Sequence, residues 1–174
     1  MEIWWLVLQT MYFFLPAYFA NMVPELLKWL PFLDYPIWEK EFGKNKTWRG
    51  IFFAVLVGTL TFLLQKWLYQ FSFFNDLSII DYAGFSLMLG LLLGLGAILG
   101  DLVESYFKRG VKIDPGQPWI PWDQLDFVLG ALSLSLLIYV PKIEVVLVIL
   151  IVSPLLHLLF CRIGYWLKIK EKRT

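Results

Sequence analysis

Five long apolar segments constrain this chain more than any other feature of its sequence. A helix needs about 20 consecutive, mostly apolar residues to cross the roughly 30 Å hydrocarbon core of a bilayer. The segments predict an all-α integral membrane protein with about five transmembrane helices, in which residues 1–174 form a single polytopic transmembrane domain. The predicted spans are Ile3–Ala20, Ile51–Phe71, Tyr82–Tyr106, Leu125–Tyr139 and Val145–Leu167.

The composition supports a membrane protein and excludes several other classes. Hydrophobic residues make up 59% of the chain and charged residues only 17%, whereas soluble domains average about 25% charged residues. A soluble globular enzyme is therefore excluded. The formal net charge of +1 gives no basis for a nucleic-acid partner. The single cysteine, Cys161, excludes a disulfide framework and a cysteine-built zinc site.

The basic residues predict the orientation of the spans. Thirteen of the fifteen Lys and Arg residues fall in the segment between the first two spans, between the third and fourth, or at the C-terminal end. Because cytoplasmic loops carry an excess of basic residues, the N-terminus is predicted outside and the C-terminus in the cytoplasm of a multi-pass cell-membrane protein. Two large cytoplasmic loops follow, at residues 21–50 and 109–126, and the first is expected to fold as short interfacial helices.

Acidic residues gather beside the second of these loops. Asp101, Glu104 and Lys108 share one face of the third span, because residues spaced by three, four or seven positions line up on a helix. A local Glu104–Lys108 salt bridge is the simpler explanation for part of this stripe. Asp123 and Asp126 are three positions apart where the fourth span begins, and one of them alone is explained as a helix N-cap. Mg²⁺ binds such carboxylates together with substrate phosphates, so the acids predict a cation site.

Basic residues border the acids from two sides. The segment Lys44–Gly50 directly precedes the second span, and Thr47 is its expected N-cap, which would leave the first amides of that helix free to bind phosphate. Simple anchoring by positive charges at the membrane surface is the alternative. The predicted phosphate-binding residues are Lys46, Thr47, Arg49, Lys108, Arg109 and Lys112.

Three sequence motifs together resemble a known family. The runs Gly100–Arg109 and Pro121–Phe127 resemble the signature of the CDP-diglyceride synthase superfamily, and Phe42–Gly50 resembles its second signature. The opening Pro16–Asn21 and the small size are similar to the archaeal branch, the CDP-archaeol synthases. One departure is Gln117–Pro121, which stands where bacterial members carry Gly-His-Gly-Gly.

The resemblance implies a reaction and a set of site residues. CTP would react with an isoprenoid ether lipid phosphate, digeranylgeranylglyceryl phosphate, to give CDP-archaeol and pyrophosphate with Mg²⁺ as cofactor, among membrane lipids. The residues at the family's acidic positions are Asp101, Asp123 and Asp126, with Glu104 as a further candidate metal ligand. The oligomeric state is left open.

Two other classes of protein remain as alternatives. One is a different CTP-dependent lipid enzyme, either a CDP-diacylglycerol synthase or a polyprenol kinase. The other is a small transporter or scaffold without enzymatic activity. The acids at one end of the spans argue against a transporter, whose ionisable groups usually lie near the middle of the membrane.

The orientation predicts which loops are accessible from outside an intact cell. In a Cys161→Ala background, a cysteine placed at Asn75 should react with a membrane-impermeant maleimide, because it lies in an outer loop. A cysteine at Asn45 should react only after the cells are permeabilised. The reverse pattern would place the predicted site on the wrong side of the membrane.

Overall fold

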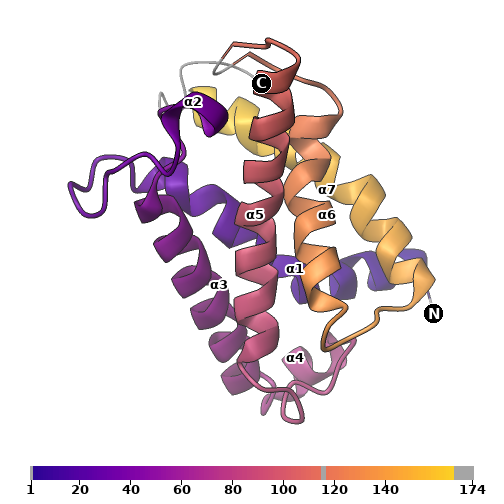
Figure 1. Ribbon diagram of the computed structural model, residues 1–174. Helices are drawn as coiled ribbons and strands as arrows, with labels where there is room; N and C mark the ends of the chain where they lie inside the picture. The colour runs from indigo at the N-terminus through magenta and orange to yellow at the C-terminus, as the bar shows by residue number, and fades with distance from the viewer. Residues whose placement is uncertain (1, 115–116, 167–174) are drawn as a thin grey trace.

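The computed structural model describes residues 2–114 and 117–166, which form a bundle of helices (Figure 1). Within this part of the chain no strand forms, and an isolated β-bridge joins Pro36 to Thr47. The all-α prediction is confirmed. The helices are α1 (Ile3–Leu26), α2 (Glu39–Phe42), α3 (Trp48–Leu68), α4 (Ser72–Asp76), α5 (Met88–Gly110), α6 (Trp122–Ser135) and α7 (Ile143–Trp166).

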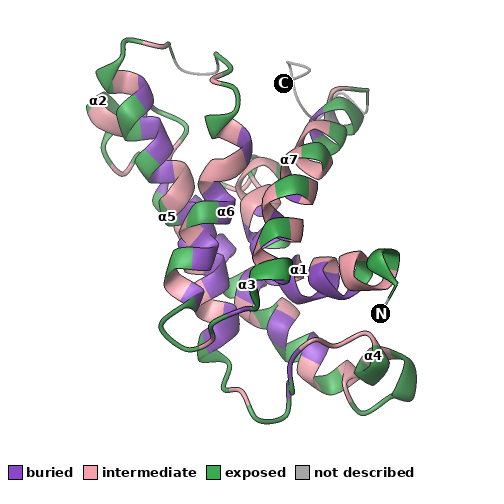
Figure 2. Ribbon diagram, turned by 90° about the vertical axis from the view of Figure 1, so that its right-hand side faces the viewer, coloured by how far each residue is buried: buried purple, intermediate pink, exposed green. Residues whose placement is uncertain are grey.

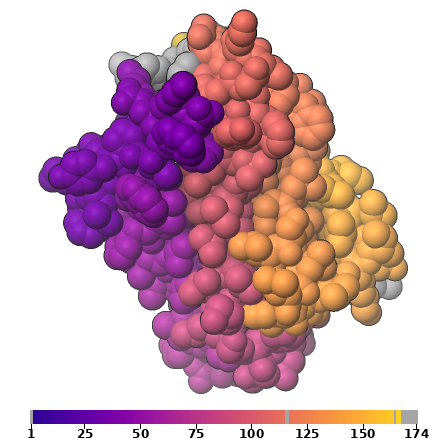
Figure 3. All heavy atoms as spheres, in the orientation of Figure 1, coloured from indigo at the N-terminus to yellow at the C-terminus, as the bar shows by residue number. Residues whose placement is uncertain are grey.

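Helix α5 is the centre of the bundle. It contacts α3 on one side and α6 on the other, and α1 runs across behind them (Figure 1). Helix α7 packs against α1 and α6, while α2 and α4 lie near opposite ends of α5. The space-filling view shows α5 as a continuous strip between α3 and α6 (Figure 3). Helix α5 therefore lies between the other elements that carry polar residues at one end of the bundle.

Aromatic side chains fill the interior where α1, α3 and α5 meet. Phe13, Phe14, Phe62 and Tyr82 have no exposed surface, and Phe127 is 2% exposed. The Tyr82 ring centroid lies 5.3 Å from that of Phe62, within the range of a favourable aromatic pair. Buried residues follow the inner sides of the helices (Figure 2), so the core is built from large rings packed between helices.

Four helices are long and apolar enough to cross a membrane, judged on the described residues: α1, α3, α5 and the segment Ile143–Ile163 of α7. The fourth predicted span, Leu125–Tyr139, is a 14-residue helix, α6. At 1.5 Å per residue, such a helix covers about 21 Å and does not cross a 30 Å core by itself. Of the about five transmembrane helices predicted, four thus have spanning length among the described residues, and the short fourth span is observed as α6.

Several predicted boundaries also differ from the observed ones. Helix α1 continues to Leu26 through Pro24, so the first loop begins six residues later than expected. A proline inside a membrane helix is tolerated where its neighbours satisfy the freed backbone groups. Helix α5 begins at Met88, not at Tyr82, because the residues between them form turns held by Lys66, whose ammonium donates to the Tyr82 carbonyl at 2.8 Å. Residue Leu167, the predicted end of the last span, lies outside the described residues.

Glycines allow α5 to touch both of its neighbours through the backbone. A Cβ atom added to Gly94 would lie 2.8 Å from the Ala54 carbonyl oxygen of α3, and one added to Gly100 would lie 2.1 Å from the Asp126 carbonyl oxygen of α6. Gly96 meets Gly130 of α6 in the same way. The small residues spaced four apart thus serve close helix packing, as their pattern predicted.

The contact at Gly100 predicts a large loss of stability on adding one methyl group. Gly100→Ala should lower the free energy of unfolding by about 1–3 kcal/mol, because α5 and α6 must separate to admit the Cβ atom. Gly110→Ala is the matched control on the same helix, since no atom lies within 4 Å of its added Cβ. Thermal unfolding in detergent measures both. Equal melting temperatures for the two variants would contradict the close contact.

Candidate functional site

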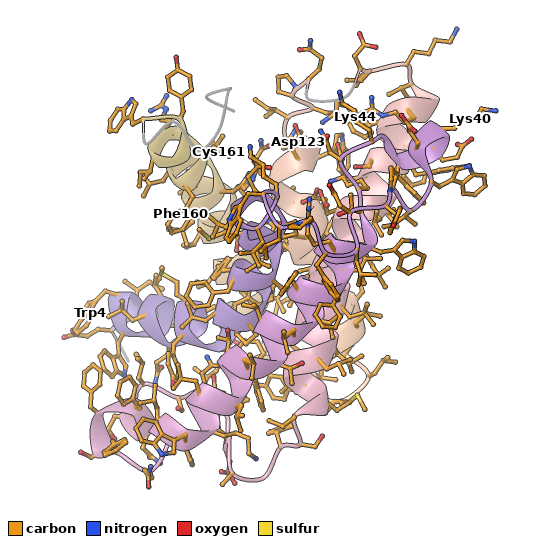
Figure 4. All side chains as sticks on the ribbon, turned by 90° about the vertical axis from the view of Figure 1, so that its left-hand side faces the viewer. Trp4, Lys40, Lys44, Asp123, Phe160 and Cys161 are labelled. Carbon is orange, nitrogen blue, oxygen red and sulfur yellow. The ribbon has the colours of Figure 1, made fainter. Side chains whose placement is uncertain are left out.

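The predicted acidic and basic residues gather at one end of the bundle, where α5, α6 and the segment before α3 meet. We call the six central residues the polar cluster. Asp123 and Lys44 mark this end in Figure 4, away from Trp4. The polar cluster consists of Lys46, Asp101, Glu104, Lys108, Asp123 and Asp126.

Lys46 joins the loop before α3 to α5. Its ammonium donates to both carboxylate oxygens of Asp101 at 2.6 Å, and each side chain is less than a quarter exposed. Burial lowers the pKa of the Lys46 ammonium, but the charges of Asp101, and then of Asp126 and Glu104, outweigh that effect and raise its pKa above the usual value. Lys46 is therefore a fixed positive charge among three carboxyl groups.

Lys108 joins α5 to α6. Its ammonium lies 2.5 Å from Asp123 Oδ1 and 3.3 Å from Glu104 Oε1. The predicted Glu104–Lys108 salt bridge is confirmed, and it is one half of a bridge between two helices. Lys108 and Glu104 are both more than 90% buried. Removing either charge would therefore leave the other one buried without a partner, which destabilises the fold.

Asp123 is not used as the N-cap of α6. The N-cap position is Pro121, and no side chain caps the helix there. Instead, Asp123 Oδ2 accepts a hydrogen bond from the Trp119 backbone N–H at 2.5 Å, while Oδ1 binds Lys108. Both oxygens of Asp123 are thus occupied by the protein itself, as are both oxygens of Asp101, but one partner of Asp123 is a backbone N–H.

Asp126 faces Asp101 beside one of the closest contacts between α5 and α6. Its Oδ1 accepts a hydrogen bond from the Phe127 backbone N–H at 2.5 Å, and its backbone carbonyl borders Gly100, the residue before Asp101. The absence of a side chain at Gly100 brings the two acids together. Lys46 is the cation whose charge lies close to both.

The first backbone amides of α3 are not free, in contrast to the prediction. Thr47 is the N-cap, as predicted, and accepts a hydrogen bond from the Gly50 N–H at 3.3 Å. However, the next two amides donate to carbonyl groups of the preceding loop: Trp48 N–H to Tyr35 at 3.1 Å and Arg49 N–H to Leu33 at 2.9 Å. The prediction that these first amides are free to bind phosphate is therefore wrong for this structure.

The remaining predicted basic residues occupy different surroundings. Arg49 is buried and contacts the loop before α3, not the carboxylates. Arg109 Nε and Nη1 are buried and, within the described part of the chain, have no hydrogen-bond partner. Lys112 is exposed at the end of α5, in a left-handed backbone conformation with φ of 61°. An anion would satisfy these two buried nitrogens of the half-buried Arg109 side chain.

Two polar residues near the cluster had no role in the sequence analysis. Ser105 donates to Glu104 Oε2 at 3.4 Å. Gln124 is 3% exposed, and its Oε1 has no hydrogen-bond partner among the described residues. The sequence signal for Gln124 was its position between the two acids of Asp-Gln-Leu-Asp. A buried amide there needs a hydrogen-bond partner.

The carboxylates fit a divalent cation only in combination with a ligand. Among the described residues, no three or more His, Cys, Asp or Glu side chains are placed to hold a metal ion together. A cage made of protein alone is therefore absent from that part of the chain. Asp101 and Asp126 supply the one or two carboxylates with which Mg²⁺ is commonly bound when substrate phosphates complete its shell.

Comparisons with known proteins agree with the motifs. The family model described as CarS-like, CDP-archaeol synthase, matches residues 3–173. The chain is 35% identical to the CDP-archaeol synthase of Pyrococcus furiosus over 155 residues, which cover 87% of this chain and 88% of the relative. It is 34% identical to that of Methanocaldococcus jannaschii over 170 residues, which cover 95% and 96%.

A solved structure is also similar. It is described as "Structural insight into an intramembrane enzyme for archaeal membrane lipids biosynthesis" and matches with a TM-score of 0.68 and 26% identity, covering 86% of this chain and 90% of that chain. Together with the four apolar helices, this similarity shows a multi-pass membrane protein.

The double contact of Lys108 predicts that its charge stabilises the bundle. Lys108→Met should lower the free energy of unfolding by about 3 kcal/mol, because it leaves two carboxylates at a helix contact without their cation. Lys112→Met, one turn further along at an exposed position, should change stability little. Thermal unfolding of both variants tests this. A Lys108→Met protein as stable as the wild type would show that the carboxylates do not depend on this lysine.

Proposed function

We propose, from the premise that this chain belongs to the CDP-archaeol synthase family, that its polar cluster transfers CMP from CTP to an isoprenoid ether lipid phosphate. The chain is a nucleotidyltransferase that forms CDP-archaeol. The proposal extends to the identity of the lipid, to the metal and to the role of each residue. The observation that carries it is the group of lysines and carboxylates at one end of membrane-spanning helices.

The reaction needs charge neutralisation more than proton transfer. An oxygen of the lipid phosphate, proposed to be digeranylgeranylglyceryl phosphate, attacks the α-phosphorus of CTP. The bond from that phosphorus to the β-phosphate oxygen breaks, and pyrophosphate leaves. A phosphate monoester has a second pKa of about 6, so the attacking oxygen is already ionised near neutral pH. No general base is required, in accord with a cluster built from lysines and carboxylates.

The cations of the cluster suit a triphosphate. Lys46 has a flexible side chain that extends from a loop, and Arg109 has two buried guanidinium nitrogens, Nε and Nη1, without a hydrogen-bond partner in the described part. These two groups are proposed to bind the phosphates and to stabilise the charge that develops on the leaving pyrophosphate. Lys108 and Asp123 are proposed to hold α5 and α6 at the spacing that the site requires, because they bind each other across the two helices.

Mg²⁺ is the proposed cofactor. Asp101 and Asp126 would hold it with the triphosphate oxygens, and Glu104 is a further candidate on the same face of α5. A bound divalent cation supplies neutralisation of the phosphate charge and polarisation of the α-phosphate. Because Lys46 binds both oxygens of Asp101 in this structure, metal binding there requires Lys46 to release at least one of them.

An apolar groove beside the cluster suits the lipid chains. It measures about 440 Å³ and is lined by apolar or aromatic side chains of α2 and α5, namely Phe42, Leu99, Leu102, Val103, Tyr106 and Phe107. Leu102 directly follows Asp101. A lipid with its phosphate at the polar cluster is therefore proposed to lay an isoprenoid chain along this part of α5, at the cytoplasmic face of the cell membrane.

The carboxylates predict the effects of charge-removing substitutions on turnover. Asp101→Asn and Asp126→Asn should each lower CDP-lipid formation from radiolabelled CTP by about 10²–10³-fold, the usual cost of removing one electrostatic stabiliser. Helix content and melting temperature should change little, because Asn preserves the shape. Rates measured against Mg²⁺ concentration should shift to higher metal demand in both variants.

A matched control removes an acid outside the cluster. Glu25→Gln disrupts an exposed pair with Lys28 and should leave turnover and metal dependence unchanged. Wild-type rates and wild-type Mg²⁺ dependence in both Asp variants would place the metal elsewhere. A wild-type protein that incorporates no CTP into an ether phosphatidic acid would exclude the proposed function.

A further inference from the structure

Arg49 binds the loop that precedes it. Its side chain is 7% exposed, although it is charged and lies in the first turn of α3. Nη1 donates to the Leu30 carbonyl oxygen, and Nη2 lies 2.9 Å from Asp34 Oδ1. Both contacts are made to residues 15 to 19 positions earlier in the chain. The guanidinium therefore ties the end of the first loop to its beginning.

The backbone reinforces the same connection. Arg49 N–H donates to the Leu33 carbonyl at 2.9 Å and Trp48 N–H to the Tyr35 carbonyl at 3.1 Å. Ile37 N–H donates to the Lys46 carbonyl at 2.9 Å, which completes the bridge between Pro36 and Thr47. These contacts close the loop at residues 30–37 against residues 46–49, and we call this closure the loop clamp.

Lys46 lies inside the loop clamp. Its backbone carbonyl is one of the clamped groups, and its ammonium is 2.6 Å from Asp101. A lysine side chain on an unrestrained loop loses much rotamer and backbone freedom when it is held at one place. Fixing the Lys46 backbone in advance removes part of that cost, in the way that preorganisation of a loop strengthens binding.

We propose that Arg49 is a positioning residue, which acts through the loop clamp to hold Lys46 at Asp101 and at the triphosphate, and that it does not itself bind phosphate. The inference rests on the proposed function for the role of Lys46. The geometric basis of the positioning role does not depend on that function. The Leu30 carbonyl and the Asp34 carboxylate already bind Nη1 and Nη2, and Nε alone of the three nitrogens has no partner among the described residues. Turning Arg49 to a phosphate would release both.

A double-mutant cycle between Arg49 and Lys46 tests the proposal, because the two side chains act in series if Arg49 only positions Lys46. Arg49→Lys keeps the charge but loses the planar fork that binds two acceptors, and it should lower kcat/KM for CTP by about 10-fold or more. Lys46→Met should lower it further. The double variant should be within about twofold of Lys46→Met alone, since coupled residues are not additive.

Limited proteolysis gives a second measurement that does not depend on activity. Trypsin sites at Lys40 and Lys44 are exposed on the loop (Figure 4). In the purified protein, cleavage there should be several-fold faster in Arg49→Lys than in the wild type, because opening of the loop clamp exposes the backbone. Glu25→Gln, which breaks the exposed pair between Glu25 at the end of α1 and Lys28 at the start of the same loop, should leave both cleavage and kcat/KM unchanged.

Asp34→Asn provides a milder variant in case Arg49→Lys fails to fold. Asp34 is 53% exposed, so its substitution should lower kcat/KM by no more than about fivefold, the size of a partly exposed ion pair. The loss should again vanish in a Lys46→Met background. A merely structural role would instead reduce the amount of folded protein and leave the cycle multiplicative.

The outcomes separate the two claims. Multiplicative losses in the cycle, with unchanged cleavage at Lys40 and Lys44, overturn the positioning role and leave Arg49 as a direct phosphate ligand. Wild-type kcat/KM in Arg49→Lys overturns it as well. If the wild-type protein converts no CTP, the proposed function fails, and the cleavage rates alone decide whether Arg49 holds the loop.

Discussion

The rest of the structure depends on the close contact between Gly100 and the Asp126 carbonyl. It also depends on the lysines that neutralise the acids on either side of this contact. Because Gly100 has no side chain, α5 and α6 approach closely enough to place the Asp101 and Asp126 carboxylates near each other. Two carboxylates held that close at the end of membrane-spanning helices repel each other and are poorly solvated. Lys46 stabilises this pair, because it lies 2.6 Å from Asp101 and its charge also acts on Asp126. Lys108 does the same for the neighbouring acids Glu104 and Asp123.

The two lysines reach the acids from different kinds of structure, which divides their roles. Lys108 extends from α5 and binds its own helix and α6, so its position is set by helix packing. Lys46 extends from a loop whose ends are tied together through Arg49 and the Pro36–Thr47 bridge. A helix-borne cation suits a structural ion pair. A loop-borne cation suits a group that must exchange a carboxylate for a phosphate during a reaction cycle.

Hydropathy and spacing predicted the parts of this structure that depend on local sequence. The apolar runs located all five long helical segments, the i, i+4 spacing predicted the Glu104–Lys108 pair, and Thr47 was recognised as the N-cap of α3. Each of these features is decided within a few neighbouring residues. The family motifs then predicted which acids and bases belong to one site, because the motifs combine residues from separate helices.

Other features depend on contacts between distant segments, and the sequence gives no local signal for them. The amides at the start of α3 looked free, but carbonyls from Leu33 and Tyr35 occupy them. Asp123 looked like an N-cap, but it accepts from Trp119 and binds Lys108 of another helix. The end of α6 was placed four residues too late, at Tyr139, because an apolar sequence continues past the point where the helix ends at Ser135.

The polar cluster is proposed to transfer a nucleotidyl group and not a terminal phosphate. Parallel reactions of the purified protein with CTP labelled at the α-phosphate or at the γ-phosphate, and with an ether phosphatidic acid as acceptor, test it most directly. Nucleotidyl transfer should place α-label in the lipid and γ-label in pyrophosphate, in equal amounts. Transfer of γ-label to the lipid, with release of CDP, would identify a CTP-dependent kinase and contradict the account.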